Sequence, residues 1–216
     1  AHPETLPPDA ETQLLNIGRH IFAQDKGNPR VRAFWWARFV DIAAWFIAEE
    51  QARRDKGMQL IAAEPQGKIL IDGLTLKGRA DRIDRLPDGS LSILDYKTGG
   101  VPSKADVESG IEPQLQLLAL IAASGGFADI GATPSGSLEY WALKGGSGGC
   151  KIIAFKDDKI PGLVAQAETG LKNLIATFAD PKTPYEAAPK PRLQPRYNDY
   201  AHLSRLAEWG RTGEEQ

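Results

Sequence analysis

The sequence is poor in cysteine and contains no long hydrophobic run. Cys150 is the only cysteine among the 216 residues, which excludes an internal disulfide and an iron–sulfur cluster held by four thiolates of this chain. A bound metal ion must therefore rely on oxygen or histidine ligands. No stretch approaches the roughly 18 consecutive apolar residues of a membrane span, and the first residues, AHPETLPPDAE, lack the basic and apolar regions of a signal peptide. We expect a cytoplasmic protein that has no contact with membranes.

An excess of charge of one sign is also absent. The formal net charge is −2, and 25% charged with 42% hydrophobic residues is an ordinary composition for a globular protein. Such a charge gives no overall attraction to nucleic acid, so DNA binding would depend on local patches or on a partner subunit. We expect one compact domain over residues 1–180 and a proline-rich extension with a short helix over residues 181–216.

Apolar residues recur at helical spacing near the beginning of the chain. The segment from Ala10 to Gln24 follows Asp9, a favourable N-cap residue, and carries one apolar stripe. The segment 31–54 repeats large apolar side chains three and four positions apart. We expect two helices there, and we expect the charged end of the second helix, EEQARR, to face water.

From Met58 onward, short apolar runs alternate with glycines, which predicts four successive antiparallel strands. The four expected strands are MQLIAAE, GKILID, LTLKGRADRID and SLSILDYK. We expect a helix over residues 113–124, then two strands around the loop GGSGG, and a last helix over residues 162–178. In the extension, three apolar side chains could dock on the core or on a partner, namely Leu203, Leu206 and Trp209.

The last of these strands ends in two charges. Asp95 and Lys97 in LSILDYKTGG are two positions apart, so their side chains project from the same face of a strand. Burying either charge without a partner costs several kcal/mol. The pair therefore either neutralises itself or performs chemistry, and a simple salt bridge of Asp95 with Lys97 or Arg79 is the plain alternative.

The loop before this strand decides which upstream aspartate joins Asp95. A two- or four-residue loop centred on Asp88 and Gly89 would bring Asp84 onto the Asp95 face. A three-residue loop would instead set Asp81 directly across from Asp95. The residues Pro87-Asp88-Gly89 suit the three-residue loop, because a type I turn favours proline at its first central position and the left-handed position after the turn favours glycine. The sequence therefore favours Asp81.

Two carboxylates on paired strands with a lysine beside them indicate metal-assisted chemistry on a phosphate. Carboxylate oxygens are the hard ligands that Mg²⁺ or Mn²⁺ prefers, and such a site keeps positions for water and phosphate. The lysine can orient or acidify an attacking water and offset charge in the transition state. Glu64, near the beginning of the first expected hairpin, is a further candidate carboxylate.

The order of the motifs adds to this interpretation. GRADRID, then DYKTG, then PQLQLLAL resemble the PD-(D/E)XK nuclease superfamily, in particular the RecB-like C-terminal nuclease domain of AddB in bacterial AddAB complexes. The resemblance implies an α/β fold with a restriction-endonuclease-like core, in which helices flank a central mixed β-sheet. It also implies an exonuclease-type, metal-dependent deoxyribonuclease that acts on DNA within a helicase-nuclease of double-strand break repair, with an AddA-like subunit as partner.

The resemblance assigns roles to individual residues. Asp81 and Asp95 would bind Mg²⁺ or Mn²⁺, Lys97 would serve the attacking water, and Gln114 would match the glutamine of the motif that follows the active site. The chain departs from the family at Leu118, where an aromatic residue is usual, and it lacks the upstream histidine segment, since the surroundings of His20 do not match. Three alternatives stay open. They are an active nuclease, a scaffold or DNA-end-binding module with an incomplete site, and a different phosphoester hydrolase or unrelated α/β module in which DYKTG is accidental.

Contacts to DNA are expected at two places. Arg79, Thr98 and Lys104 flank the expected metal site and are candidates for phosphate contacts. The segment KGNPRVRAFWWAR combines cations with aromatic side chains, which are the components of a single-strand channel, although aromatics at helical spacing more often belong to a core.

Overall fold

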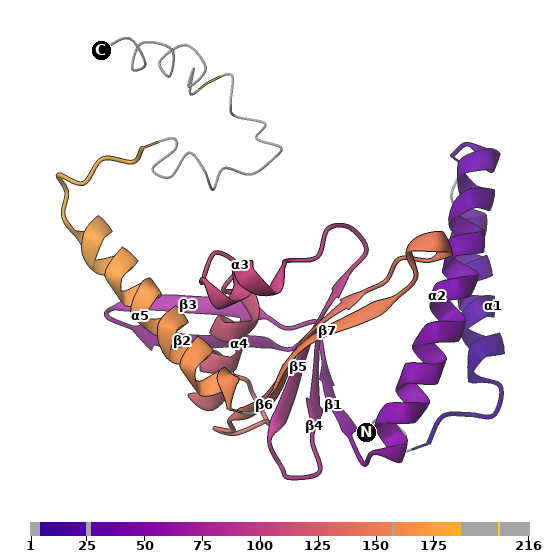
Figure 1. The fold of residues 1–216 in the computed structure, drawn as a ribbon, viewed down its shortest axis with the longest axis horizontal. Coiled ribbons are helices and arrows are strands. Elements are labelled where there is room, and N and C mark those ends of the chain that lie inside the picture. Colours follow the sequence, from indigo (N-terminus) through magenta and orange to yellow (C-terminus); the bar gives the residue numbers. More distant parts are fainter. Residues whose placement is uncertain (1–4, 25–26, 157, 187–202, 204–216) are drawn as a thin grey trace. The chain divides into compact units, whose positions relative to one another are not determined.

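The computed structural model describes residues 5–24, 27–156, 158–186 and 203 (Figure 1). The chain divides into two units, residues 1–173 and 174–216, and the first unit contains the sheets. The helices are α1 (Ala10–Gln24), α2 (Pro29–Asp55), α3 (Lys104–Glu108), α4 (Gln114–Ala123) and α5 (Lys159–Ala179), with a short 3₁₀ turn η1 (Gly146–Gly148). The strands are β1 (Gln59–Ala63), β2 (Gln66–Ile71), β3 (Leu74–Arg79), β4 (Arg82–Arg85), β5 (Leu91–Lys97), β6 (Ser135–Ala142) and β7 (Lys151–Lys156).

The central sheet is mixed. Its five strands follow the order β1-β4-β5-β6-β7, and only the β5–β6 pair is parallel. A parallel pair needs a crossover connection, which α3 and α4 supply between β5 and β6. Figure 1 shows α4 and α5 on one side of this sheet and α2 on the other. The predicted α/β fold with a central mixed sheet flanked by helices is confirmed.

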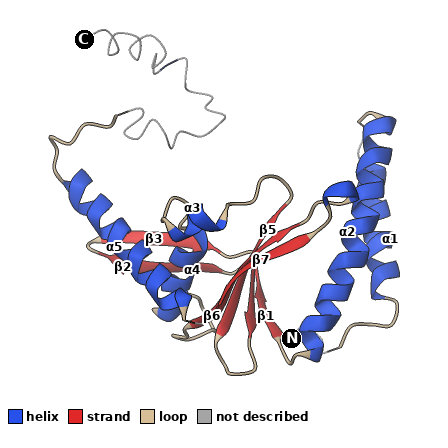
Figure 2. Ribbon diagram, in the orientation of Figure 1, coloured by secondary structure: helices blue, strands red, loops and turns tan. Residues whose placement is uncertain are grey.

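The expected strand LTLKGRADRID is in fact two strands in different sheets. β3 pairs with β2 in a separate two-stranded sheet, whereas β4 joins the central sheet. This hairpin lies beside α4 (Figure 2). Glycine is required there, because a Cβ on Gly67 would lie 2.6 Å from Ile121 Cγ2, and one on Gly78 would lie 2.8 Å from Leu118 Cδ2. Leu118 thus fills the space above Gly78.

The apolar core lies between the central sheet and α4. Sheet residues Ile83, Ile93 and Leu138 are fully buried, and they belong to one cluster with Leu115 and Ile121 of α4. Burial of one such side chain contributes about 1.5–3 kcal/mol. This packing fixes the beginning of α4 beside the end of β5.

The opposite face of the sheet is covered by a buried ionic network, which corrects the expectation that EEQARR faces water. Glu50 and Arg53 of α2 are only 3% and 6% exposed. Arg53 donates to Asp84 Oδ2 over 2.9 Å and to Glu139 Oε2 over 2.8 Å, and Arg82 binds both Glu50 and Asp84. The acidic partners come from strands far along the chain, so the sequence of α2 alone does not reveal that its charges are buried.

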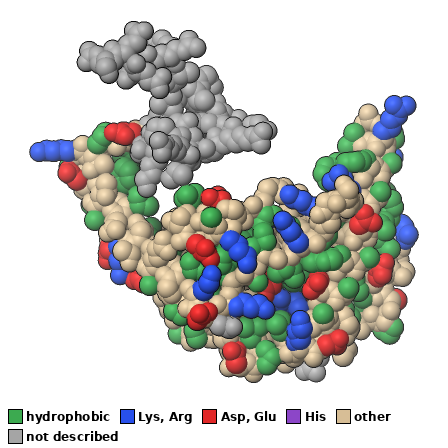
Figure 3. Space-filling model, in the orientation of Figure 1, with side chains coloured by type: hydrophobic (Ala, Val, Ile, Leu, Met, Phe, Trp, Pro, Cys, Tyr) green, Lys and Arg blue, Asp and Glu red, His purple; other side chains and the backbone are tan. Residues whose placement is uncertain are grey.

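Charges of both signs are dispersed over the surface. Figure 3 shows acidic and basic side chains interspersed with apolar ones on one face of the protein, in keeping with the net charge of −2.

No helix in the described ranges is both long and apolar enough to span a membrane. Of the extension, residues 187–202 and 204–216 lie outside the described residues, and with them the expected docking residues Leu206 and Trp209.

Candidate active site

The hairpin between β4 and β5 places Asp81 opposite Asp95. Its loop has three residues, because the Leu86 N–H donates to the Ser90 carbonyl over 2.8 Å and Gly89 takes the left-handed conformation with φ +85°. The strands then pair in constant register, Arg82 with Leu94, Ile83 with Ile93 and Asp84 with Ser92. One further step sets Asp81 across from Asp95, so the predicted loop and register are confirmed.

Asp84, the alternative ligand, lies on the other face of the sheet. Its carboxylate is fully buried and accepts hydrogen bonds from Arg53 and Arg82. Neighbouring positions of a strand project to opposite faces, and Asp84 is three positions from Asp81, which faces Asp95. The alternative that placed Asp84 beside Asp95 is therefore wrong.

Asp95, Lys97 and Gln114 contact one another at the end of β5. Lys97 Nζ lies 2.7 Å from Asp95 Oδ2 and donates to Gln114 Oε1 over 3.1 Å. Gln114 Nε2 donates to Asp95 Oδ1 over 2.5 Å. Asp95 is 3% exposed, whereas the Lys97 side chain is 28% exposed. The ammonium group is thus held at the carboxylate and remains accessible to solvent.

Asp81 is held beside this cluster through the backbone of β5. Its Oδ2 accepts the Tyr96 N–H over 2.8 Å. Burial and the negative charge of Asp81 raise the pKa of Asp95, although Lys97 and Gln114 act in the opposite direction. The carboxylates of Asp81 and Asp95 repel each other, and the charged form of Asp95 is disfavoured. A cation bound between them would relieve this repulsion.

Tyr140 forms the buried wall of the site and was missed in the sequence. It is paired with Asp95 in the parallel β5–β6 register, and its ring centroid lies 5.8 Å from Lys97 Nζ. Burial and the charge of Asp95 raise the pKa of Tyr140 above its ordinary value, so its hydroxyl stays protonated at neutral pH. The sequence predicts an apolar strand around Tyr140, but only the β5–β6 register shows that Tyr140 lies next to Asp95.

The donor set fits a hydrated divalent cation. Mg²⁺ is usually bound through one or two carboxylates and keeps several waters, which suits Asp81 and Asp95. Asp95 Oδ2 is buried and accepts no directed hydrogen bond within the described residues, its contact being the ion pair with Lys97. Within the same residues, no group of three or more histidine, cysteine, aspartate or glutamate side chains is arranged so that it could hold a metal ion. A cation would therefore depend on water and substrate for most of its ligands.

Two further residues singled out in the sequence lie outside this cluster. Glu64 donates its N–H to the Asp81 carbonyl over 2.9 Å, but its exposed carboxylate lies 3.6 Å from Arg79. His20 is exposed on α1 and hydrogen-bonds with Gln24 over 3.0 Å. The structure thus brings the backbone of Glu64 next to the site, and it brings together Asp81, Asp95, Lys97 and Gln114.

The expected phosphate contacts are all exposed. Thr98 directly follows Lys97, and Lys104 begins α3 with its Nζ 6.0 Å from the ring of Phe155. Arg79 ends β3 and lines a hollow of about 250 Å³ together with Gln114. Their contacts to DNA stay predictions.

The aromatic segment of α2 is divided between core and surface. Trp36 packs against Phe22 of α1, with ring centroids 5.6 Å apart. Phe34 and Trp35 are about half exposed, and the guanidinium of Arg38 lies 4.4 Å from the Phe34 ring centroid. Of these three aromatic residues, only Trp36 packs in the interior. A contact of Phe34 and Trp35 with DNA stays a prediction.

Parts of this sequence are similar to known proteins. The chain is similar to an uncharacterized protein of Rickettsia conorii, with 32% identity over 123 residues, which are 55% of this chain and 15% of that protein. It is also similar to a subunit of an ATP-dependent helicase/deoxyribonuclease of Streptococcus agalactiae, with 39% identity over 67 residues, which are 29% of this chain and 6% of that one. The chain thus spans only a small part of these relatives.

Structural and family comparisons cover more of the chain. The crystal structure of SSO0001 aligns with 76% of this chain and 68% of its own, at a TM-score of 0.30 and 17% identity. The family model of the PD-(D/E)XK nuclease superfamily matches residues 2–197. This match covers the two strands, the turn and the helix that carry Asp81, Asp95, Lys97 and Gln114. The chain belongs to the PD-(D/E)XK nuclease superfamily.

Proposed function

We propose that this chain is a metal-dependent DNA phosphodiesterase domain. The observation that carries the proposal is the register of the β4–β5 hairpin, which sets Asp81 across from Asp95 on the face where Lys97 and Gln114 also lie. A salt bridge alone would not need a second carboxylate, whose charge raises the pKa of Asp95. The arrangement of the two carboxylates is therefore better explained by the binding of a cation than by a contribution to the stability of the fold.

Each residue has a distinct role in this proposal. Asp81 and Asp95 would hold Mg²⁺ or Mn²⁺, which supplies a polarised phosphoryl oxygen and an acidified water. Lys97 would orient the attacking water and stabilise the negative charge that develops on the phosphate. Gln114 would keep the Asp95 and Lys97 side chains in place, since it hydrogen-bonds to both. Tyr140 stays neutral and excludes water from the buried side.

The wider context is also a proposal. We infer an exonuclease-type activity inside a helicase-nuclease that processes double-strand breaks, with an AddA-like helicase-nuclease subunit as partner. The similarity to a protein named as a subunit of an ATP-dependent helicase/deoxyribonuclease supports this context. A partner that unwinds DNA would also compensate for the low net charge, because the helicase would deliver the strand.

The test is cleavage of end-labelled DNA with Mn²⁺ by the unaltered chain and by Lys97→Ala. We expect a loss of about 10²-fold or more, the scale on which a single electrostatic stabiliser acts. Lys159→Ala is the matched control, because Lys159 forms an exposed ion pair with Glu108 on the surface. Equal cleavage by Lys97→Ala and Lys159→Ala would end the proposal.

A second function is a scaffold or DNA-end-binding module with an incomplete site. The observation in its favour is that the described residues gather two carboxylates and no third ligand of the acid, histidine or cysteine type. This function predicts that DNA retention in a gel shift with chelator is the same for the unaltered chain and for Asp95→Ala, and that neither cleaves DNA with Mn²⁺. Cleavage by the unaltered chain would exclude it.

A further inference from the structure

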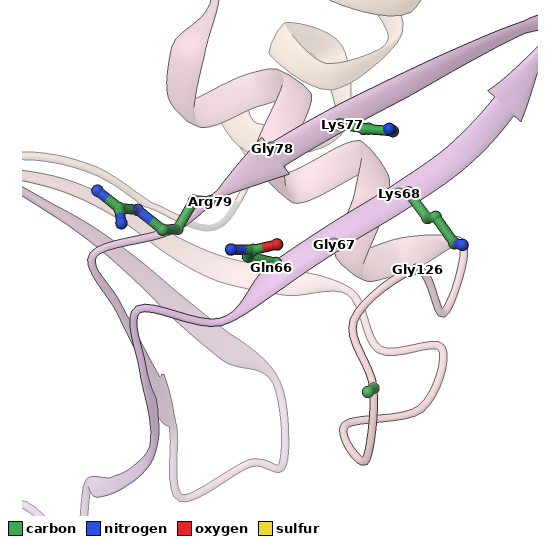
Figure 4. Close-up of a pocket in the computed structure, with 8 residues that line it drawn as sticks. Gln66, Gly67, Lys68, Lys77, Gly78, Arg79 and Gly126 are labelled. Carbon is green, nitrogen blue, oxygen red and sulfur yellow. The ribbon is translucent and has the colours of Figure 1, made fainter.

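The outer face of the β2–β3 hairpin is basic. Two cross-strand pairs form it, Gln66 with Arg79 and Lys68 with Lys77. All four side chains are exposed, and Figure 4 shows them leaving the two strands. The glycine pair that lies between them, Gly67 with Gly78, faces α4 instead, where a Cβ would collide. The hairpin thus buries its inner face and presents three cations on its outer face.

The described part of the chain gives the charges of this face no acidic partner other than Glu64. Lys68 and Lys77 lie directly opposite each other, an arrangement that destabilises a strand pair. Within the described residues, neither side chain forms an ion pair or a side-chain hydrogen bond. Among the same residues, Arg79 pairs only with Glu64, an exposed pair at 3.6 Å, which is a weak interaction. Such a pattern is explained if an anionic ligand binds there.

Two hollows adjoin the hairpin. A groove of about 620 Å³ is lined by Gln66, Lys68, Lys77 and Arg79 together with glycines of both strands and Gly126 and Ala128. A smaller hollow of about 250 Å³ lies between β3 and α4, and Lys77 and Arg79 line it together with Gln114 and apolar side chains of α4. Lys77 and Arg79 therefore border both hollows, and Gln114, which hydrogen-bonds to Asp95 and Lys97, borders the second.

We propose that the outer face of the β2–β3 hairpin binds the phosphate backbone of a single DNA strand and guides it to Asp95. This inference rests on the proposed function, because it names the path by which the substrate of that site arrives. Lys77 and Arg79 are two positions apart on one strand, about 6.8 Å, a step on the scale of one nucleotide. The cations occupy a patch only two strands wide, with about 4.8 Å between the strands, so they can contact one backbone at a time.

The test is binding of a fluorescent oligothymidylate, followed by anisotropy in the presence of a chelator so that no cleavage occurs. The variant is Lys68→Gln with Lys77→Gln, and the matched control is Lys151→Gln with Lys156→Gln, two exposed lysines of strand β7. We expect the hairpin variant to bind at least about tenfold more weakly at low salt, and the slope of log K against log salt to fall by about 1.4, at about 0.7 for each contact. The β7 variant should bind like the unaltered chain.

Three results would overturn the proposal. They are an unchanged slope in the hairpin variant, an equal loss in the β7 variant, or competition by polyglutamate as strong as by unlabelled oligothymidylate, which would assign the face to an acidic protein segment. Misfolding is controlled by thermal unfolding, because removal of two opposed lysines should leave the midpoint unchanged or raise it.

A cleavage measurement separates this inference from the proposed function. The Lys68→Gln with Lys77→Gln variant should cleave a thymidine dinucleotide like the unaltered chain and a long oligothymidylate more slowly, because the single phosphate of the dinucleotide is the one held at Asp81 and Asp95. Selective binding without any cleavage by the unaltered chain would refute the proposed function and leave the binding face established.

Discussion

Gln114 donates its side-chain amide to Asp95 Oδ1 over 2.5 Å, from the first residue of α4 to the end of β5. Its amide oxygen accepts a hydrogen bond from Lys97 over 3.1 Å. One side chain on a helix therefore orients both charges of the strand. The beginning of a helix also carries a partial positive charge, which favours the carboxylate form of Asp95.

Substitution Gln114→Ala should lower kcat with little effect on KM, because it frees Asp95 and Lys97 without removing either charge. The variant loses two hydrogen bonds, each of about 1 kcal/mol, which together amount to roughly 30-fold in rate at most. The measurement is steady-state cleavage of an oligonucleotide, with the exposed Gln166→Ala of α5 as control. A rate equal to that of Gln166→Ala would show that Gln114 does not position these groups.

Binding of Mn²⁺ should depend on Asp81 and Asp95 and not on other carboxylates. Isothermal calorimetry on Asp81→Asn and on Asp95→Asn should show binding weakened or lost, because each substitution removes one of two anionic ligands. Asp88→Asn is the folded control, since Asp88 lies in the exposed turn and hydrogen-bonds to Ser90. Unaltered binding by Asp81→Asn would refute the assignment of that residue as a ligand.

Asp95 should lower the stability of the metal-free protein at neutral pH. Its folded pKa is raised, mainly by burial, so its favourable contribution is complete below its ordinary pKa of about 4 and is lost as the pH rises through the folded pKa. Asp95→Asn should therefore unfold at a midpoint a few degrees higher at pH 7, and the difference should vanish below about pH 4. Thermal scans over this pH range in chelator would show it, and a lower midpoint at pH 7 would contradict the expectation.

The part of the site that could be predicted from the sequence is local. The residues Pro87-Asp88-Gly89 define a turn, and the turn fixes the register that brings Asp81 to Asp95. The alternation of side chains along one strand likewise fixes Asp95 and Lys97 on one face. Neither conclusion requires contacts between distant segments.

The parts that were missed depend on distant partners or on very short signals. The burial of Glu50 and Arg53 follows from acids and bases on β4 and β6, which no pattern within α2 reveals. The break between β3 and β4 has only a short signal, a change in the phase of the apolar alternation between Ala80 and Ile83. The short helix α3 was overlooked although its signal is local, a capping box between Ser103 and Asp106.

Glu139→Gln should destabilise the fold strongly, because Glu139 is the buried acceptor for Arg53. It is 4% exposed and also accepts from Ser137 and from the Trp141 indole N–H, each over 2.8 Å. Removing one partner of a buried ion pair costs about 3–5 kcal/mol. Urea unfolding should show this loss, whereas Glu168→Gln, which removes an exposed pair with Lys172, should cost about 0–1 kcal/mol. Similar free energies of unfolding for the two variants would contradict a stabilising role of the network.

The same network should make the protein sensitive to acid. Burial raises the pKa values of Glu50 and Glu139, but their partners outweigh it and hold both pKa values below the usual range. The partners of Glu50 are Arg82 and Arg54, and those of Glu139 are Arg53 and the hydrogen bonds from Trp141, Ser137 and Ser92. A carboxyl with a lowered pKa contributes stability that is present above its ordinary pKa of about 4.3 and is lost as the pH falls through the folded value. Urea midpoints should therefore decline below about pH 4 in the unaltered chain and decline less steeply in Glu139→Gln, which has lost one of the two titrating groups. Parallel declines in both proteins would show that acid unfolding originates outside this network.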